Sequence, residues 1–82
     1  MIITKEQHDK IQPIVERINR IMDLEDASWE DKYNAIFSKE LSRVFFDTFP
    51  SFDYYDPDTS YQEDVCEFVW AVNSFWKDIH IV

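Results

Sequence analysis

Residues 60–79 read SYQEDVCEFVWAVNSFWKDI, and they carry the clearest helical pattern of the chain. Apolar side chains recur there at spacings of three and four, which is typical of an amphipathic helix. Ser60 and Glu63 have the spacing of a capping box, which signals a helix start. The pattern predicts a helix over about 61–79. Its apolar stripe consists of Tyr61, Val65, Phe68, Val69, Val72, Phe75, Trp76 and Ile79.

Another helix is predicted near the start of the chain. Thr4 and Gln7 have the spacing of a second capping box, and the apolar stripe after them predicts a helix over about 5–23. Pro13 lies inside this segment. Because the stripe continues on both sides of the proline, we expect one kinked helix rather than two helices.

The middle of the chain predicts a further helix, over about 29–48. Ser28 is a candidate cap at its start, and Pro50 ends it. Its predicted buried face consists of Trp29, Tyr33, Ile36, Phe37, Leu41, Val44 and Phe45.

These helices predict an all-α fold in a single domain, residues 1–82. Short connections favour a small antiparallel three-helix bundle, with helices at 5–23, 29–48 and 61–79. The connection at residues 50–60 is an aromatic and acidic loop, with Asp-Pro at positions 56 and 57. The two ends of the chain are apolar, a pattern compatible with pairing as a short ribbon.

The charge of the chain is regional. The net charge is −9, and no lysine or arginine lies between Arg43 and Lys77. An acidic field steers a basic partner from a distance, and exposed rings anchor it at contact. A small core does not readily hide so many rings, so we interpret this interval as part of a protein interface. It holds eleven of the fourteen aromatic rings and seven carboxylates, which are Asp47, Asp53, Asp56, Asp58, Glu63, Asp64 and Glu67.

Composition also excludes several classes of function. An acidic surface repels nucleic acid phosphates and anionic lipids, so we expect direct binding neither to nucleic acid nor to a membrane. The chain has no glycine, which argues against phosphate-binding loops and nucleophile elbows. Since no catalytic arrangement is recognisable, we expect a protein that is not an enzyme and uses no cofactor. The apolar start at residues 1–3 is too short for a signal peptide, which favours a cytoplasmic location.

No residues have the spacing of a metal site. Asp53, Asp56 and Asp58 depart from the order of ligands in an EF-hand, and the glycine that such a loop requires is missing. The two histidines lie at opposite ends of the sequence, and Cys66 has no histidine near it in sequence to activate its thiol. We expect all three to be surface or packing residues.

Tyr54 and Tyr55 form the preferred contact patch, bracketed by Asp53, Asp56 and Asp58. Flat rings beside carboxylates suit a surface rich in lysine or arginine, through cation–π and charge-assisted contacts. The alternative is that the rings fold back onto the helices while the aspartates keep the loop soluble. In either case we expect one of the two tyrosines to point outward.

Trp70 lies on the polar side of the last predicted helix, opposite the apolar stripe. Two explanations stay open: packing against the loop or the chain end, and a role as an anchor for a partner. Glu63 and Glu67 share this side about 6 Å apart along the helix axis, a spacing comparable to that of neighbouring phosphates on a duplex. Phe46 is also off its stripe, and with Trp70 it is a candidate contact of a homodimer.

Acidic residues cluster around the start of the middle helix as well. Glu30 and Asp31 lie in its first turn, where the positive end of the helix dipole favours them. Asp23, Glu25 and Asp26 have no such role and remain as surplus charge.

The overall profile, small, acidic, aromatic and free of motifs, resembles that of proteins that phages use to disable host defence enzymes. Tyr54-Tyr55 ahead of the last helix is also similar to small helical immunity proteins, in which an acidic helical surface and a Tyr-Tyr pair meet a nuclease toxin. The resemblance implies a partner that is basic, such as a nuclease or another nucleic-acid-binding defence enzyme.

We therefore predict a non-catalytic inhibitor of a basic, nucleic-acid-handling protein, of the anti-restriction or anti-CRISPR kind, with DNA mimicry as one mode of action. It would act in the cytoplasm, that of the host if a phage encodes it. The alternatives are an immunity protein that neutralises a nuclease toxin and a homodimeric structural or adaptor module. The predicted contact residues are Asp53, Tyr54, Tyr55, Asp56, Asp58, Glu63, Glu67 and Trp70.

Overall fold

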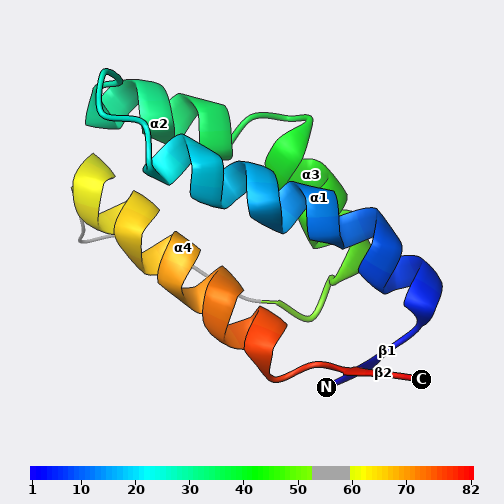
Figure 1. Cartoon of the computed structure of the whole chain (residues 1–82). Coiled ribbons are helices and arrows are strands. Elements are labelled where there is room, and N and C mark those ends of the chain that lie inside the picture. The colour runs from blue at the N-terminus through cyan, green and yellow to red at the C-terminus, as the bar shows by residue number, and fades with distance from the viewer. Residues whose placement is uncertain (53–59) are drawn as a thin grey trace.

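The computed structural model describes residues 1–52 and 60–82. The chain is mostly helical, which confirms the all-α prediction. Figure 1 shows the two termini together at one end of the molecule. Among the described residues, no helix is long and apolar enough to cross a membrane. In chain order the elements are β1 (Ile2–Ile3), α1 (Lys5–Met22), α2 (Trp29–Ile36), α3 (Leu41–Thr48), α4 (Tyr61–Lys77) and β2 (His80–Ile81).

Three helices begin at their predicted caps. The Thr4 hydroxyl accepts the N–H of Gln7 at 3.1 Å, and the Gln7 side-chain oxygen accepts the N–H of Thr4 at 3.0 Å. Ser60 and Glu63 exchange the same two bonds, each at 3.4 Å. The Ser28 hydroxyl accepts the N–H three residues further on at 3.1 Å. These side chains satisfy backbone donors that a helix start leaves without a partner.

The prediction of one helix over 29–48 is wrong, because this segment forms two helices, α2 and α3, separated by residues 37–40. Ser38 accounts for the break. Its hydroxyl accepts the N–H of Leu41 at 3.2 Å, and its carbonyl accepts the N–H of Ser42 at 3.1 Å. A serine that bonds the backbone in this way competes with a continuing helix and favours a new start. The described residues therefore form four helices, where a bundle of three was predicted.

The direction of the middle helices also differs from an antiparallel bundle. Tyr33 in α2 packs on Tyr61 at the start of α4, with ring centroids 4.5 Å apart, whereas Phe49 after α3 packs on Phe75 near the end of α4, at 5.0 Å. The α2–α3 pair therefore runs parallel to α4, and α1 runs the opposite way (Figure 1). A connection of the length of 50–60 reaches about 36 Å when extended. A helix as long as α4 spans only about 25 Å, so the parallel arrangement is within reach.

A cluster of phenylalanines fills the core between α3 and α4. Phe45 is fully buried. Its ring lies edge to face with five others, at centroid distances of 5.0–6.4 Å. Aromatic rings prefer this geometry, which adds to the stabilisation from burial. The five surrounding rings are Phe46, Phe49, Phe52, Phe68 and Phe75.

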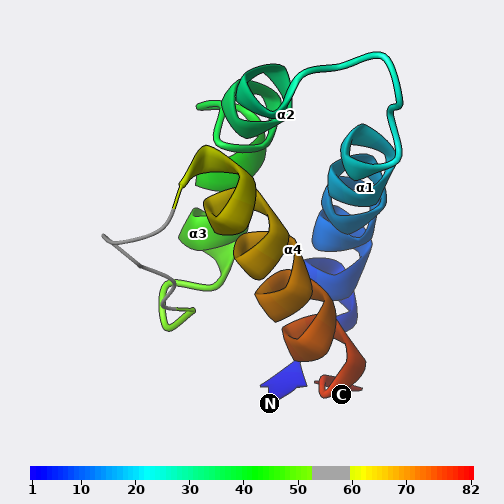
Figure 2. The ribbon, with the colours of Figure 1, turned by 90° about the vertical axis from the view of Figure 1, so that its left-hand side faces the viewer.

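α1 packs against α2, α3 and α4 and continues as one helix across Pro13, as predicted. Figure 2 shows α1 on one side of α4 and α2 and α3 on the other. Asn19 of α1 and Asn73 of α4 exchange two side-chain hydrogen bonds, at 3.1 and 3.0 Å. Asn73 is half-buried in this contact.

The ends of the chain pair as a ribbon, as their apolar sequence allowed. β1 and β2 are parallel, with Ile2 opposite His80 and Ile3 opposite Ile81. Ile3 is buried and joins the hydrophobic core, which fixes the ribbon to the helices. We call this part of the molecule, β1 and β2, the ribbon end.

Candidate interaction surface

The structure describes three of the eight residues that were predicted to contact a partner. Glu63, Glu67 and Trp70 belong to α4. The preferred contact patch, which includes the three aspartates considered for calcium binding, lies outside the described residues. That patch is Asp53, Tyr54, Tyr55, Asp56 and Asp58.

Glu63, Glu67 and Trp70 lie on the outer side of α4. Spacings of four and three residues place them on one face of the helix, and all three are exposed. Trp70 is 73% exposed, so packing against the chain end does not account for it. The role of this indole as an anchor for a partner stays a prediction.

Phe46, the other candidate for a homodimer contact, is engaged inside the chain. Its ring centroid lies 5.8 Å from that of Phe52 and 6.0 Å from that of Phe68. The residue is half-buried against the core. Intramolecular packing therefore accounts for Phe46.

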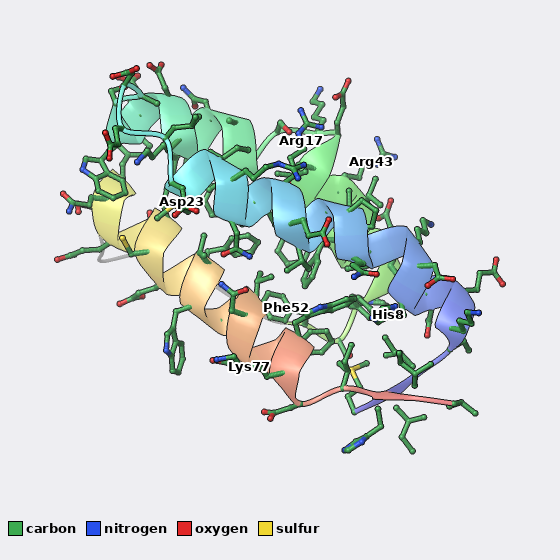
Figure 3. All side chains as sticks on the ribbon, in the orientation of Figure 1. His8, Arg17, Asp23, Arg43, Phe52 and Lys77 are labelled. Atoms are coloured by element: carbon green, nitrogen blue, oxygen red, sulfur yellow. The ribbon has the colours of Figure 1, made fainter. Side chains whose placement is uncertain are left out.

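The end of α1 and the starts of α2 and α4 meet at the end of the molecule opposite the termini (Figure 1). Asp23 marks this place in Figure 3. We call it the acidic end and define it as residues 23–31 and 61–67. It gathers two acidic segments that are distant in the sequence. Its exposed carboxylates are those of Asp23, Glu25, Asp26, Glu30, Asp31, Glu63 and Glu67.

Apolar side chains are exposed among these carboxylates. Leu24 is 52% exposed and Tyr61 is 57% exposed, and Trp29 is exposed as well. Trp29 and Tyr61 were predicted to be buried, since both belong to apolar stripes. Each is the first residue of its helix. At this first position the apolar stripe of each helix extends beyond the neighbouring helices that cover the rest of it. Tyr61 rests edge to face on Tyr33, with one side left open to solvent.

Lys32, beside the acidic end, does not place its charge at the surface, whereas Arg20 in the last turn of α1 is an exposed cation near it. Lys32 is the only basic residue between Arg20 and Lys39, and it is buried. Its ammonium donates to the carbonyl oxygen of Met22 at 3.0 Å and lies 4.7 Å from the centre of the Trp29 ring. That carbonyl belongs to the last turn of α1, where the helix dipole favours a cation. The ammonium of Lys32 therefore caps the C-terminal end of α1.

The seven exposed carboxylates of the acidic end take no part in the ion pairs found among residues 1–52 and 60–82. Those pairs join His8 to Asp9 at 3.4 Å and Arg43 to Asp47 at 3.6 Å. Figure 3 shows Arg17 and Arg43 pointing away from α4. These seven carboxylates are thus not neutralised by close pairing with a cation of the described residues, which suits long-range attraction of a positive surface.

The rings between Arg43 and Lys77 contribute less to this surface than the sequence suggested. Only Tyr61 and Trp70 are exposed among the described ones. Seven others belong to the core or pack against it, and they are Phe45, Phe46, Phe49, Phe52, Phe68, Phe75 and Trp76. The interpretation of these rings as mainly interface is therefore corrected, because parallel packing of α3 on α4 buries them together.

The described residues that were considered for metal binding or catalysis are His8, His80 and Cys66, and they pack against a ring or lie at the surface. His8 stacks on Trp76 with ring centroids 5.0 Å apart and planes 17° apart. His80 and Cys66 are exposed. Within the described ranges, no three potential metal ligands come together.

A hollow of about 400 Å³ lies beside the ribbon end, between the start of α1 and the end of α3. Glu6 and Asp47 line it together with Lys10, so its charges are of both signs. It therefore does not share the uniform charge of the acidic end. Its full lining is Thr4, Glu6, Gln7, Lys10, Asp47 and Thr48.

Comparison with protein-family models, with curated proteins and with solved structures finds no match to this chain.

Proposed function

We propose that this protein is a small, non-catalytic inhibitor that binds a basic, nucleic-acid-handling protein, such as a nuclease or another defence enzyme. The observation that carries the proposal is the acidic end, where seven exposed carboxylates surround exposed rings. Lys32, at the edge of that region, is buried, and Arg20 in the last turn of α1 is an exposed cation near it. Surfaces that bind nucleic acid are rich in lysine and arginine, and an acidic, aromatic surface is complementary to them.

The contact would combine two kinds of interaction. Carboxylates accept charge-assisted hydrogen bonds from arginine and lysine, and the rings of Trp29 and Trp70 offer cation–π contacts. Glu63 and Glu67, one helical turn apart, present charge at a spacing close to that of phosphates on a duplex, which suits DNA mimicry. Inhibition then follows from occupancy of the nucleic-acid site, by steric and electrostatic competition. Such a role fits a phage-encoded anti-restriction or anti-CRISPR protein.

The direct test is capture of the partner. The tagged chain is incubated with a nuclease-treated lysate of its natural host, eluted in steps of rising salt, and the eluted proteins are identified. We expect a basic nucleic-acid-binding protein that elutes at moderate salt, because salt screens contacts between exposed charges. Its binding to DNA should then be lost as the inhibitor is added. A nuclease toxin in the eluate would favour an immunity protein instead, and retention of non-basic proteins alone would reject the proposal.

Trp70→Ala tests the contact surface on the captured partner. We expect affinity to fall about tenfold or more, since exposed tryptophans that become buried in an interface dominate binding energy. The melting temperature should stay nearly unchanged, because Trp70 is 73% exposed in the free protein. Ile2→Ala, at an apolar residue that is 70% exposed at the ribbon end, is the matched control and should bind normally. Equal affinity of the two variants would remove Trp70 from the site.

A further inference from the structure

The ribbon end has an open edge of backbone hydrogen-bonding groups. The N–H groups of His80 and Val82 donate to the carbonyls of Met1 and Ile3, at 2.8 and 2.9 Å. Successive backbone groups of a strand point to opposite sides. The N–H and C=O of Ile81 therefore point away from β1, toward the outer edge of β2.

The outer edge of β2 is accessible. Both residues of β2 are exposed, and Ile81, whose N–H and C=O point outward, is 51% exposed. Unpaired strand edges are templates for pairing with another strand, and a two-stranded ribbon is only marginally stable by itself. Addition of strands at this edge would stabilise the ribbon.

Charge indicates which partner suits this edge. Residues 1–10 hold Lys5 and Lys10 against Glu6 and Asp9, and residues 77–82 hold one lysine and one aspartate. The side chains of the ribbon end and its flanks therefore sum to zero. Residues 11–76 hold fourteen acidic and five basic side chains, which is the whole net charge of −9. Two copies of such a chain repel each other through their net charge, and the balanced ribbon end with its flanks adds nothing to that repulsion.

We propose that the outer edge of β2 binds a second copy of this chain. The two β2 strands pair antiparallel about a two-fold axis at Ile81, and each Ile81 donates its N–H to the carbonyl of the other, which closes a four-stranded sheet. A two-fold contact of this kind uses the same surface on both copies, as closed dimers do. A basic partner has no comparable attraction to this end, since its charge is balanced.

Dimerisation here places the two acidic ends at opposite poles of the assembly. Each stays free to bind, so the dimer is bivalent toward any partner of the acidic end. The self-association itself is independent of the proposed inhibitory function and is tested without a partner. With strands of two residues the contact is small, so the dimer is expected to be weak and to form with rising concentration.

Analytical ultracentrifugation from micromolar to millimolar concentration is the primary measurement. The wild-type chain should shift from monomer to dimer. Ile81→Pro removes the outward N–H and keeps both bonds from β2 to β1, so the variant should stay monomeric. Ile2→Pro is the matched control, because it removes an N–H on the opposite edge of the ribbon and should still dimerise. Circular dichroism and thermal melting establish that each variant is folded.

Variants of opposite charge at Ile81 show whether a monomeric variant has lost the dimer contact or has failed to fold. Across the two-fold axis the two Ile81 side chains face each other directly, so like charges there repel and opposite charges attract. Ile81→Lys and Ile81→Glu should each be monomeric, and an equimolar mixture of the two should form a heterodimer. A wild-type chain that stays monomeric throughout the range, a dimer that survives Ile81→Pro, or a mixture that does not associate would each overturn the proposal.

Discussion

The acidic end and the ribbon end use the same kinds of side chains in opposite ways. At the acidic end, carboxylates outnumber exposed cations, and Leu24, Trp29 and Tyr61 are exposed among them. At the ribbon end, lysines balance the carboxylates of residues 1–10, and Ile3 is buried in the core. The net negative charge is thus concentrated at one end of the molecule and balanced at the other.

The largest expected contrast concerns the aliphatic side chains of the two ends. Ile3→Ala should destabilise the protein by about 2–5 kcal/mol, because it leaves a cavity where a fully buried side chain packs. Leu24→Ala should change stability by about 0.5 kcal/mol or less, since Leu24 is largely exposed. Urea denaturation of both variants makes the measurement. Similar losses for the two would mean that Leu24 is part of the fold rather than of a surface for binding.

The next contrast concerns the buried cation of the acidic end. Lys32→Ala should destabilise the protein by about 1–3 kcal/mol, because it removes the hydrogen bond to the Met22 carbonyl and leaves that group without its partner. Lys39→Ala removes the same charge from an exposed position and should have little effect. Urea denaturation of both variants compares the two. If they were equally stable, Lys32 would be a solvated lysine and would balance charge at the surface.

Association with the captured basic partner should show a smaller difference. Reversal of two charges at the acidic end, Glu25→Lys with Asp26→Lys, should slow association by about tenfold at low salt, through loss of electrostatic steering. Glu6→Lys with Asp9→Lys changes the net charge equally, near the ribbon end, and should slow association less. Stopped-flow kinetics at two ionic strengths make the comparison. Equal rates for the two double variants would show that only net charge matters.

The smallest expected effect is on the stability of the free protein. Neutralisation of the loop carboxylates, Glu25→Gln with Asp26→Asn, should raise stability by a few tenths of a kcal/mol at low salt, because it relieves repulsion among neighbouring carboxylates. The gain should shrink as salt is added, since the screening length falls to about 8 Å at physiological ionic strength. Glu6→Gln with Asp9→Asn should show no gain, because lysines flank these residues. Calorimetric melting at low and high salt measures both.

Local signals in the sequence predicted the starts of the helices well. The side chains of Thr4, Ser28 and Ser60 bond the backbone as their spacing indicated. The break at Ser38 was missed, because the apolar stripe continues with the same spacing on both sides of it. The direction of α2 and α3 was missed for a different reason. Periodicity tells which face of a helix is buried, but it carries no information about the direction of the neighbouring helix.

The candidate surface was predictable in part. A helical wheel was sufficient to find Trp70, Glu63 and Glu67, because exposure on a regular helix follows from spacing. Trp29 and Tyr61 were missed, since a stripe does not show where the covering helix ends. The burial of Lys32 was missed as well. The signal for the acidic end was nonetheless present in five carboxylates within residues 23–31, and only the fold shows that they lie at the same end as the start of α4.

The paired amides of Asn19 and Asn73 have a consequence for how α1 and α4 align. Isoleucine, valine and phenylalanine side chains tolerate a slide of one helix along another by a turn, about 5.4 Å, since one apolar contact replaces another. An amide pair does not tolerate it, because a slipped alignment buries both asparagines without partners. The two asparagines thus select one register of α1 against α4 among several that bury similar apolar surface. Trp70 lies one turn before Asn73 on α4, so the asparagine pair also fixes the position of the indole relative to α1.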